Sequence, residues 1–302
     1  MIDLRGRWTA DKVVVFGAGG MLGRDVCEAL AADGHGVVAL GHADCDVTVA
    51  AQVADALSTP GLTAAINCAA FTDVDRAEDE YQQANAVNAV APGIIARLAA
   101  RHGLYMVHVS TDHVFSGDGG EPYCEYDYPA PVNAYGSSKA LGESAVNQSP
   151  GDHAVVRLQW LYGGPRDFIA KIQARAVLDD KSIQVVGDMG APTSVAHAAR
   201  AIVWLMDRRR RGVWHYAASG LVSRADWAHA ILAATAGADP SRVKDVTAAT
   251  LPCAAPRPHV VELDCSKFDA AVAHDAFPLK DARPYWRHTF DAHMVAREGG
   301  LR

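Results

Sequence analysis

The feature that most constrains the fold is a glycine-rich turn between an apolar run and a helical pattern. Residues 13–16 are Val-Val-Val-Phe, and residues 21–32 place their apolar side chains on one face of a helix. Gly17 permits a tight turn after the strand, and Gly20 permits a close approach of the backbone to a ligand. Gly23 lets the helix pack closely on the strand. The pattern predicts a parallel sheet that begins with a βαβ unit.

The same turn indicates a dinucleotide site. The helix begins directly after the glycines, so its free N–H groups and the positive end of its dipole are available to a pyrophosphate. Glycine spacing alone is weak evidence, and the alternative is a plain β-to-α turn. The strand before the turn and the amphipathic helix after it favour the dinucleotide. The residues expected at the pyrophosphate are Gly17, Gly19, Gly20, Met21, Leu22 and Gly23.

The end of the second expected strand, residues 36–40, indicates the type of cofactor. An acid there would bind the ribose 2′-hydroxyl of NAD, whereas this chain continues with Gly41 and His42, which leave room for a 2′-phosphate. NADPH is therefore the expected cofactor, and NADH stays open. Asp46 and Val47 follow closely enough to approach the adenine. The alternative for Asp46 is a helix cap or a turn acid.

Apolar, β-rich runs alternate with helical patterns through the first half of the chain. This alternation predicts an α/β fold, a Rossmann-type doubly wound parallel sheet with helices on both faces. The further strands are expected at 36–40, 64–68, 105–109 and 154–158, and helical segments at 21–32, 49–57, 78–101, 134–147 and 195–206. Cys68, Ala69 and Ala70 are small residues at the end of a strand, so a cofactor can lie across that edge.

We expect two lobes. Residues 11–160 form the dinucleotide-binding domain, together with later sheet pieces around 183–216. Residues 161–182 and 217–302 have a less regular pattern and form a smaller, interleaved lobe for the substrate. Residues 116–131, rich in Gly, Pro, Asp and Tyr, form a long surface loop.

Charge and composition exclude several classes of partner. The formal net charge of −7 argues against nucleic acid and against a membrane surface, because both are polyanionic. We find no signal-peptide pattern at the start and no apolar run of about 20 residues, the length that spans a membrane. The six cysteines form no C-x-x-C pair. We therefore expect reduced thiols and a cytoplasmic protein, without a zinc site or a redox dithiol.

A tyrosine and a lysine stand four residues apart in the expected helix 134–147. Tyr135 and Lys139 would share one helix face, with about 5–6 Å between their Cβ atoms. The ammonium group would lower the pKa of the phenol and let it deliver a proton near neutral pH. Thr111 and Asp112 end a strand at the same sheet edge, where Thr111 could hydrogen-bond a substrate carbonyl. The alternative is a surface Tyr–Lys pair, which the upstream glycine turn disfavours.

Together these motifs resemble the extended short-chain dehydrogenases/reductases, and most closely the dTDP-4-dehydrorhamnose reductase family. The Ser-Thr-Asp-x-Val-Phe run at 110–115 and the Gly-Ala-Pro-Thr run at 190–193 are specific to that branch. The resembling stretches cover nearly the whole chain. They are 17–23, 67–78, 87–88, 110–117, 131–139, Arg157, 160–162, 190–193 and 257–259.

The resemblance implies a mechanism. A nicotinamide cofactor would give hydride to C4 of a dTDP-4-keto-6-deoxy-L-hexose, namely dTDP-4-dehydro-L-rhamnose or a close relative. Tyr135 would protonate the forming alkoxide, and Lys139 would support Tyr135 and the nicotinamide ribose. Thr111 and Asp112 would hold the sugar oxygens. Trp160 would pack near the sugar, unless it is a core aromatic residue.

Arg257 is the candidate for the substrate diphosphate, with a surface arginine between prolines as the alternative. The family often has Asn-Asn-Phe after its Trp-x-Tyr segment, whereas residues 163–168 here are Gly-Gly-Pro-Arg-Asp-Phe, which suggests a different substrate side. Some members bridge subunits through a metal held by acidic side chains. Residues 194–197, which follow the Gly-Ala-Pro-Thr run, contain no carboxylate, so we expect no metal.

Two rival functions stay open. One is another nucleotide-sugar enzyme, either a different ketoreductase or an epimerase that retains its NAD. The other is a non-catalytic NADP-binding subunit like the regulatory partner of methionine adenosyltransferase. Intact Tyr135, Lys139 and Thr111 weigh against the second rival. The expected partner is a small nucleotide sugar, and a homodimer stays open.

Overall fold

The structure is a computed structural model that describes residues 12–118, 120–250, 255–276 and 279–299. Cys253, expected to be a reduced thiol, lies outside the described residues, as does the expected start of the first domain at residue 11. In the described part of the chain, no helix has both the length and the apolar character needed to cross a membrane.

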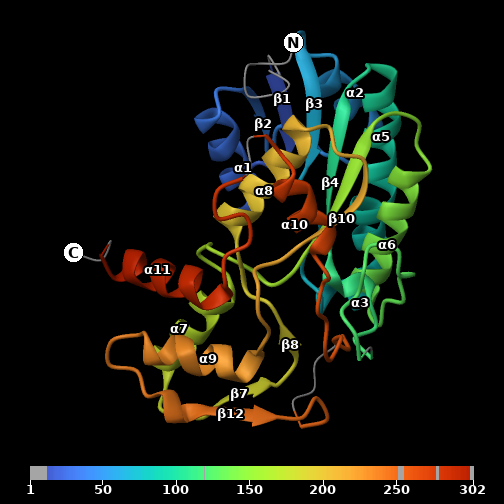
Figure 1. Cartoon of the computed structure of the whole chain (residues 1–302). Coiled ribbons are helices and arrows are strands. Elements are labelled where there is room, and N and C mark those ends of the chain that lie inside the picture. Colours follow the sequence, from blue (N-terminus) through green and yellow to red (C-terminus); the bar gives the residue numbers. More distant parts are fainter. Residues whose placement is uncertain (1–11, 119, 251–254, 277–278, 300–302) are drawn as a thin grey trace.

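A six-stranded parallel sheet forms the centre of the molecule (Figure 1). The order β10-β5-β4-β3-β1-β2 reverses direction between β1 and β3, which opens a crevice at the carboxyl ends of these two strands. This sheet confirms the expected Rossmann-type α/β fold. The strands are β1 (Lys12–Phe16), β2 (Gly36–Leu40), β3 (Leu62–Asn67), β4 (Tyr105–Thr111), β5 (His153–Leu158) and β10 (Gly212–Tyr216).

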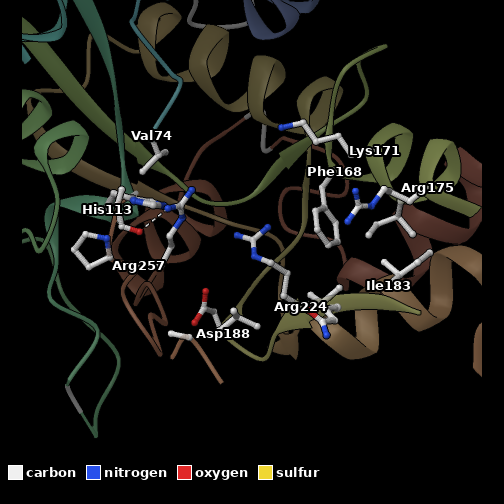
Figure 2. Close-up of a pocket in the computed structure, with 16 residues that line it drawn as sticks. Val74, His113, Phe168, Lys171, Arg175, Ile183, Asp188, Arg224 and Arg257 are labelled. Atoms are coloured by element: carbon white, nitrogen blue, oxygen red, sulfur yellow. Dashed lines mark hydrogen bonds between the residues drawn. The ribbon is translucent and has the colours of Figure 1, made fainter. Parts of the chain in front are cut away.

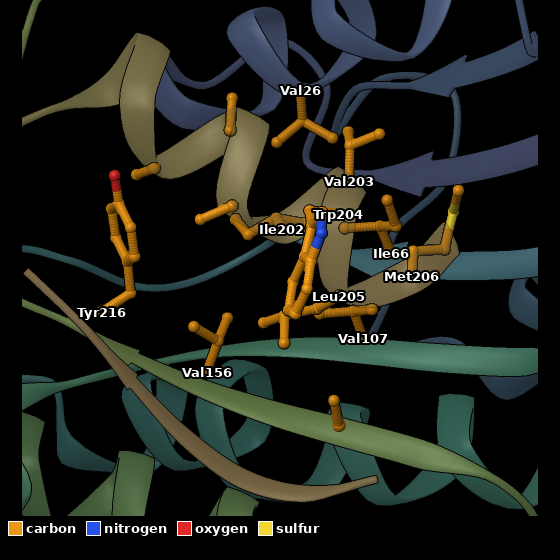
Figure 3. Close-up of a cluster of buried hydrophobic side chains, with 14 of the residues drawn as sticks. Val26, Ile66, Val107, Val156, Ile202, Val203, Trp204, Leu205, Met206 and Tyr216 are labelled. Carbon is orange, nitrogen blue, oxygen red and sulfur yellow. The ribbon is translucent and has the colours of Figure 1, made fainter. Parts of the chain in front are cut away.

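Side chains alternate between two apolar layers along each strand. In β1, Val13 and Val15 face one layer, whereas Val14 and Phe16 face the other. Figure 3 shows the first layer, where Trp204 lies between its helix and the sheet. Helices α1 (Met21–Ala32), α8 (Val195–Asp207) and α10 (Ser266–Ala273) cover this layer, and α2 (Ala50–Leu57), α5 (Ala91–Arg101) and α6 (Ala134–Asn147) cover the other.

The helix-rich stretch expected at 78–101 is interrupted. It contains α3 (Arg76–Asp79), α4 (Tyr81–Asn85), a π-helical turn η1 (Ala86–Val90) and α5. The π-helical turn carries Asn88, whose side chain accepts a hydrogen bond from Phe71 N and donates one to Phe71 O, both at 2.9 Å. Asn88 also donates to Ser138 Oγ at 3.0 Å. These bonds fix the segment after β3 against α6.

A smaller group of elements lies below the sheet in Figure 1 and packs around Trp227 and Phe290. Its helices are α7 (Phe168–Leu178), α9 (Arg224–Ala233) and α11 (Trp286–Gly299), with a short helix η3 (Pro240–Arg242). Its strand pairs are β7 (Ile183–Val186) with β12 (Val243–Val246), β8 (Met189–Gly190) with β11 (Val222–Ser223), and β6 (Leu161–Tyr162) with β9 (Thr193–Ser194).

The expected division of the chain needs two corrections. The stretch around 183 was expected in the large sheet, but β7 forms a two-stranded sheet with β12, and Ile183 packs in the smaller cluster. Conversely, α10 falls within the expected 217–302 lobe but packs on the large layer through Phe268. A short apolar strand or helix carries no local signal of which core it joins, since both cores accept the same residue types.

A buried ion pair joins α6 to strand β5 of the large sheet. Arg157 on β5 donates to Glu143 on α6 through Nε at 2.9 Å and Nη2 at 2.7 Å, and both side chains are 3% exposed. Ser110 on β4 donates to the same carboxylate at 2.5 Å. Burial, followed by the charge of Arg157, lowers the pKa of His215 to about 3, so this ring is neutral and can accept from Arg157 at 3.2 Å.

Glu143→Gln should lower the free energy of unfolding by about 3–5 kcal/mol, because Arg157 would keep a buried charge without its counter-ion. Urea unfolding followed by circular dichroism measures the change. The matched control is Glu80→Gln, which removes the carboxylate of an exposed ion pair with Arg76 and should change stability little. Equally small losses in both variants would contradict the stabilising role of the buried pair.

Candidate active site

The glycine turn fits against the loop after β3 so closely that side chains are excluded. Gly17 has φ +76°, and an added Cβ would lie 2.5 Å from Ala69 N. A Cβ on Gly23 would lie 2.2 Å from Gly17 O, so the first turn of α1 could not pack as it does. Gly20 N donates to Gly17 O at 3.0 Å. These contacts hold the start of α1 open at the crevice between β1 and β3.

A cavity of about 490 Å³, here called the glycine-turn cavity, lies at this crevice. It contains nine of the residues expected to bind the cofactor: Gly17, Gly19, Gly20, His42, Asp46, Val47, Cys68, Ala69 and Ala70. Four lining residues were not expected: Cys45, Phe71, Gln83 and Val87. Gln83 lies on α4 and Val87 on η1, in the helical segment that the sequence pattern predicts to be continuous.

Acids near the end of β2 are turned toward the backbone. Asp44 accepts a hydrogen bond from Gly41 N at 2.9 Å and does not line the glycine-turn cavity. Asp46 lines the cavity, but its Oδ1 atom accepts from the Thr48 hydroxyl at 2.7 Å and from Thr48 N at 2.9 Å. These bonds lower the pKa of Asp46. Asp46 therefore acts as a turn acid, as the alternative assignment stated, while still lying beside the cavity.

A second cavity of about 420 Å³, the central cavity, shares Gly20, Cys68 and Ala70 with the first. It brings together the rest of the expected cofactor residues and most of the expected substrate residues. They are Met21, Leu22, Gly23, Thr111, Asp112, Tyr135, Lys139 and Trp160. Residues from β4, α6 and the start of α1 thus meet at one edge of the sheet.

Tyr135 and Lys139 lie deep in the central cavity, but their electrostatics differ from expectation. Lys139 Nζ donates to Val109 O at 2.7 Å, and burial lowers the pKa of Lys139 to about 8. Burial raises the pKa of Tyr135 to about 12, with Asp112 acting in the same direction and a Thr111 hydrogen bond opposing it. The expected lowering of the phenol pKa by Lys139 is wrong for this structure. The phenol stays protonated at neutral pH, as a proton donor must.

Asp112 is held by the Gly-Ala-Pro-Thr segment through one glutamine. Gln159 Nε2 donates to Asp112 at 3.0 Å, and Gln159 Oε1 accepts from Ala191 N at 2.9 Å. Thr111 Oγ1 donates to Asp112 at 3.0 Å and accepts from His113 N at 3.2 Å, at the start of a short helix, η2 (Asp112–Val114). Both side chains therefore have fixed positions beside Tyr135.

Trp160 forms one wall of the central cavity in a strained conformation. Its φ of 42° lies in the left-handed region that favours glycine. The ring stacks on Trp227 with 5.9 Å between centroids, and a Cβ on Gly190 would lie 2.5 Å from the Trp160 ring. The residue thus joins a core aromatic stack on one side and lines the cavity on the other. Strained residues that packing holds in this way are frequent at ligand sites.

The structure shows the role of Asp167, the acidic residue in the altered run 163–168. Asp167 accepts from Gly163 N at 2.8 Å, from Gly164 N at 3.1 Å and from Ala170 N at 2.8 Å. The carboxylate is therefore the N-cap of α7 and turns away from the cavities. Of the six residues, only Phe168 lines a cavity described here.

A third cavity of about 710 Å³, the outer cavity, continues from the central one through shared residues that include His113 and Arg224 (Figure 2). Arg257 lines it but is bound to Asp75 through Nη1 at 2.7 Å and Nη2 at 2.8 Å. Arg224 was not expected from the sequence. One feature of the sequence could have indicated it. Arg224 is the first residue of α9, and the helix dipole disfavours a cation at a helix N-terminus, so an arginine there suggests a role other than helix stability.

Comparison with known proteins gives the family of this chain. The sequence matches the RmlD substrate binding domain family over residues 11–288. It is 38% identical to a dTDP-4-dehydrorhamnose reductase of Mycolicibacterium smegmatis, over 96% of this chain and 87% of the relative. It is 41% identical to a dTDP-4-dehydrorhamnose reductase of Mycobacterium tuberculosis, over 82% of this chain and 83% of the relative.

A solved structure shares the arrangement of elements. The dTDP-4-dehydrorhamnose reductase from Bacillus anthracis, in complex with NADP, superposes with a TM-score of 0.84 at 27% identity, over 95% of this chain and 99% of that one. With the family match and the two relatives, this establishes that the chain belongs to the RmlD substrate binding domain family.

Proposed function

We propose that this protein reduces the 4-keto group of a dTDP-4-keto-6-deoxy-L-hexose, dTDP-4-dehydro-L-rhamnose or a close relative, with hydride from NADPH. The observation that carries the proposal is the continuity of the cavities. The glycine-turn cavity shares residues with the central cavity, which is lined by the half-buried Tyr135 and its partner Thr111. The named activity of the relatives at 38% and 41% identity gives the substrate class.

The residues at the crevice fit a dinucleotide. Gly17 and Gly23 allow close backbone packing, whereas a Cβ on Gly19 would project into open space, and the first turn of α1 directs its N–H groups toward that space. When bound, the reduced nicotinamide supplies the hydride. NADP in the Bacillus anthracis relative, together with His42 in place of an acid after β2, supports NADPH as the cofactor.

The chain's own side chains would handle the proton and the orientation. Tyr135 holds a proton on its phenol oxygen at neutral pH and would give it to the substrate oxygen as the alkoxide forms. Thr111 and Asp112 would hold the sugar oxygens. Lys139 uses one donor on Val109 O, which leaves its others for the nicotinamide ribose and for Tyr135.

The two lobes would bind different ligands. The large sheet and its glycine turn would bind the cofactor, and the smaller cluster around Trp227 would supply the substrate side through Trp160. We also propose a cytoplasmic location, which agrees with free thiols at Cys27, Cys45 and Cys68. A homodimer remains the alternative to a monomer.

An absorbance assay tests the reaction. Purified protein is mixed with NADPH, or in parallel with NADH, and dTDP-4-dehydro-L-rhamnose is formed in situ. We expect loss of reduced-nicotinamide absorbance that depends on the sugar and is faster with NADPH. Tight NADPH binding without any turnover would reject this substrate and favour a different keto sugar or a non-catalytic subunit.

Tyr135→Phe should lower turnover by about 10²–10⁴-fold, because the proton donor is lost. NADPH affinity, measured by fluorescence titration, should stay near that of the parent protein. The matched control is Tyr162→Phe, which removes another buried hydroxyl, bound to Thr289 Oγ1 at 2.8 Å, away from the cavities described here. Full activity in Tyr135→Phe would remove Tyr135 from the proton-donor role.

His42→Glu should raise the KM for NADPH by at least about tenfold and leave the KM for NADH nearly unchanged, since the new carboxylate would repel a 2′-phosphate. Steady-state kinetics with both cofactors measure the ratio. His274→Glu, an equal charge change at the exposed C-cap residue of α10, is the control. Equal loss with both cofactors would show that His42 does not lie beside the 2′-position.

A further inference from the structure

Arg224 stands where the central and outer cavities meet. It lines both, and its guanidinium lies 3.9 Å from the centroid of the Trp160 ring and 5.1 Å from that of Phe168. Figure 2 shows the side chain extending between Asp188 and Phe168 into the open space. Two aromatic faces therefore fix the plane of the guanidinium without using its N–H groups.

The guanidinium donors of Arg224 have no partner in the described part of the chain. Its backbone N–H is bonded to Asp188 O at 2.8 Å, but no side-chain hydrogen bond or ion pair is formed. Arg157, which is fully buried, is paired with Glu143, whereas Arg224 is half-buried and lines the cavities. Unpaired N–H donors on a side chain that lines a cavity are available to a ligand.

The charge balance of the outer cavity indicates an anion. Lys171 and Arg175 line it with Arg224, against one carboxylate, that of Asp188, while Arg257 is paired with Asp75. Burial lowers the pKa of Arg224 to about 10, with Asp188 and Asp112 opposing the shift, so it is a cation at neutral pH. A planar guanidinium binds a phosphate through two parallel hydrogen bonds, which a lysine cannot do.

We propose that Arg224, and not Arg257, clamps the diphosphate of the nucleotide sugar at the junction of the two cavities. A sugar beside Tyr135 in the central cavity and a nucleoside in the outer cavity would place their linking diphosphate at this junction. Arg257 forms an ion pair with Asp75 and lines the wall of the outer cavity. The orientation of the sugar rests on the proposed function, but the clamp itself does not.

Calorimetric titration of the NADPH-saturated protein with dTDP tests the clamp without any turnover. Arg224→Gln should weaken dTDP binding by about 10- to 100-fold, the usual cost of losing charge-assisted hydrogen bonds. Its NADPH affinity should be unchanged, which also shows that the variant folds. Arg224→Lys should recover only part of the lost dTDP affinity, because a lysine keeps the positive charge but cannot form two parallel hydrogen bonds to a phosphate.

Two further variants serve as controls. Arg287 also stacks on aromatic rings, 5.8 Å from Trp286 and 5.7 Å from Phe290, but lines none of the three cavities, so Arg287→Gln should bind dTDP normally. Arg257→Gln should weaken dTDP binding less than Arg224→Gln does. A dTDP affinity within twofold of the parent in Arg224→Gln would overturn the clamp, as would a larger loss in Arg257→Gln.

The probes separate the sources of phosphate. The parent should prefer dTDP over dTMP, and Arg224→Gln should lose that preference. Inorganic pyrophosphate that binds as tightly as dTDP would overturn the nucleotide assignment, as would a parent protein that binds NADPH but no dTDP. If dTDP binds through Arg224 while the keto sugar is not reduced, the clamp stands and the proposed reaction fails.

Discussion

The contact between the glycine turn and the loop after β3 is the constraint on which the site depends. Gly17 lies so close to Ala69 that any side chain would separate the two loops. Because the sheet order reverses between β1 and β3, this contact lies at the point where their loops diverge. The glycine-turn cavity lies at this contact and shares residues with the central cavity, so the site proposed for Tyr135 and Lys139 depends on a fit between two backbone segments.

Features encoded by neighbouring residues could be predicted from the sequence. The strand–turn–helix around Gly17 and the spacing of Tyr135 and Lys139 are local, and the structure brings them to one edge. Features that depend on distant partners could not. The pKa of Tyr135 depends on burial, which the local sequence does not give. The local sequence of β7 also does not show which core it joins. The role proposed for Arg224 depends on its contacts with Trp160 and Phe168 and on the cavities that it lines.

Three cations show how differently this molecule satisfies a positive charge. Arg157 pairs with a carboxylate and Lys139 with a backbone carbonyl, and both are buried. Arg224 is half-buried and stacks on aromatic rings. Arg157 stabilises the fold through its ion pair. The donors that Lys139 and Arg224 keep free are the ones that the proposed cofactor and diphosphate would satisfy.

The left-handed backbone of Trp160 sets local strain against aromatic packing at a single position. Such a conformation costs a non-glycine residue about 1–2 kcal/mol, so glycine or asparagine would relax the backbone there. Either change would also remove the ring that stacks on Trp227 and lies against the guanidinium of Arg224. Removing a large aromatic side chain from a packed core costs about 3–5 kcal/mol, which exceeds the strain that either change would relieve. The tryptophan is therefore the more stable residue at this position despite its strained backbone.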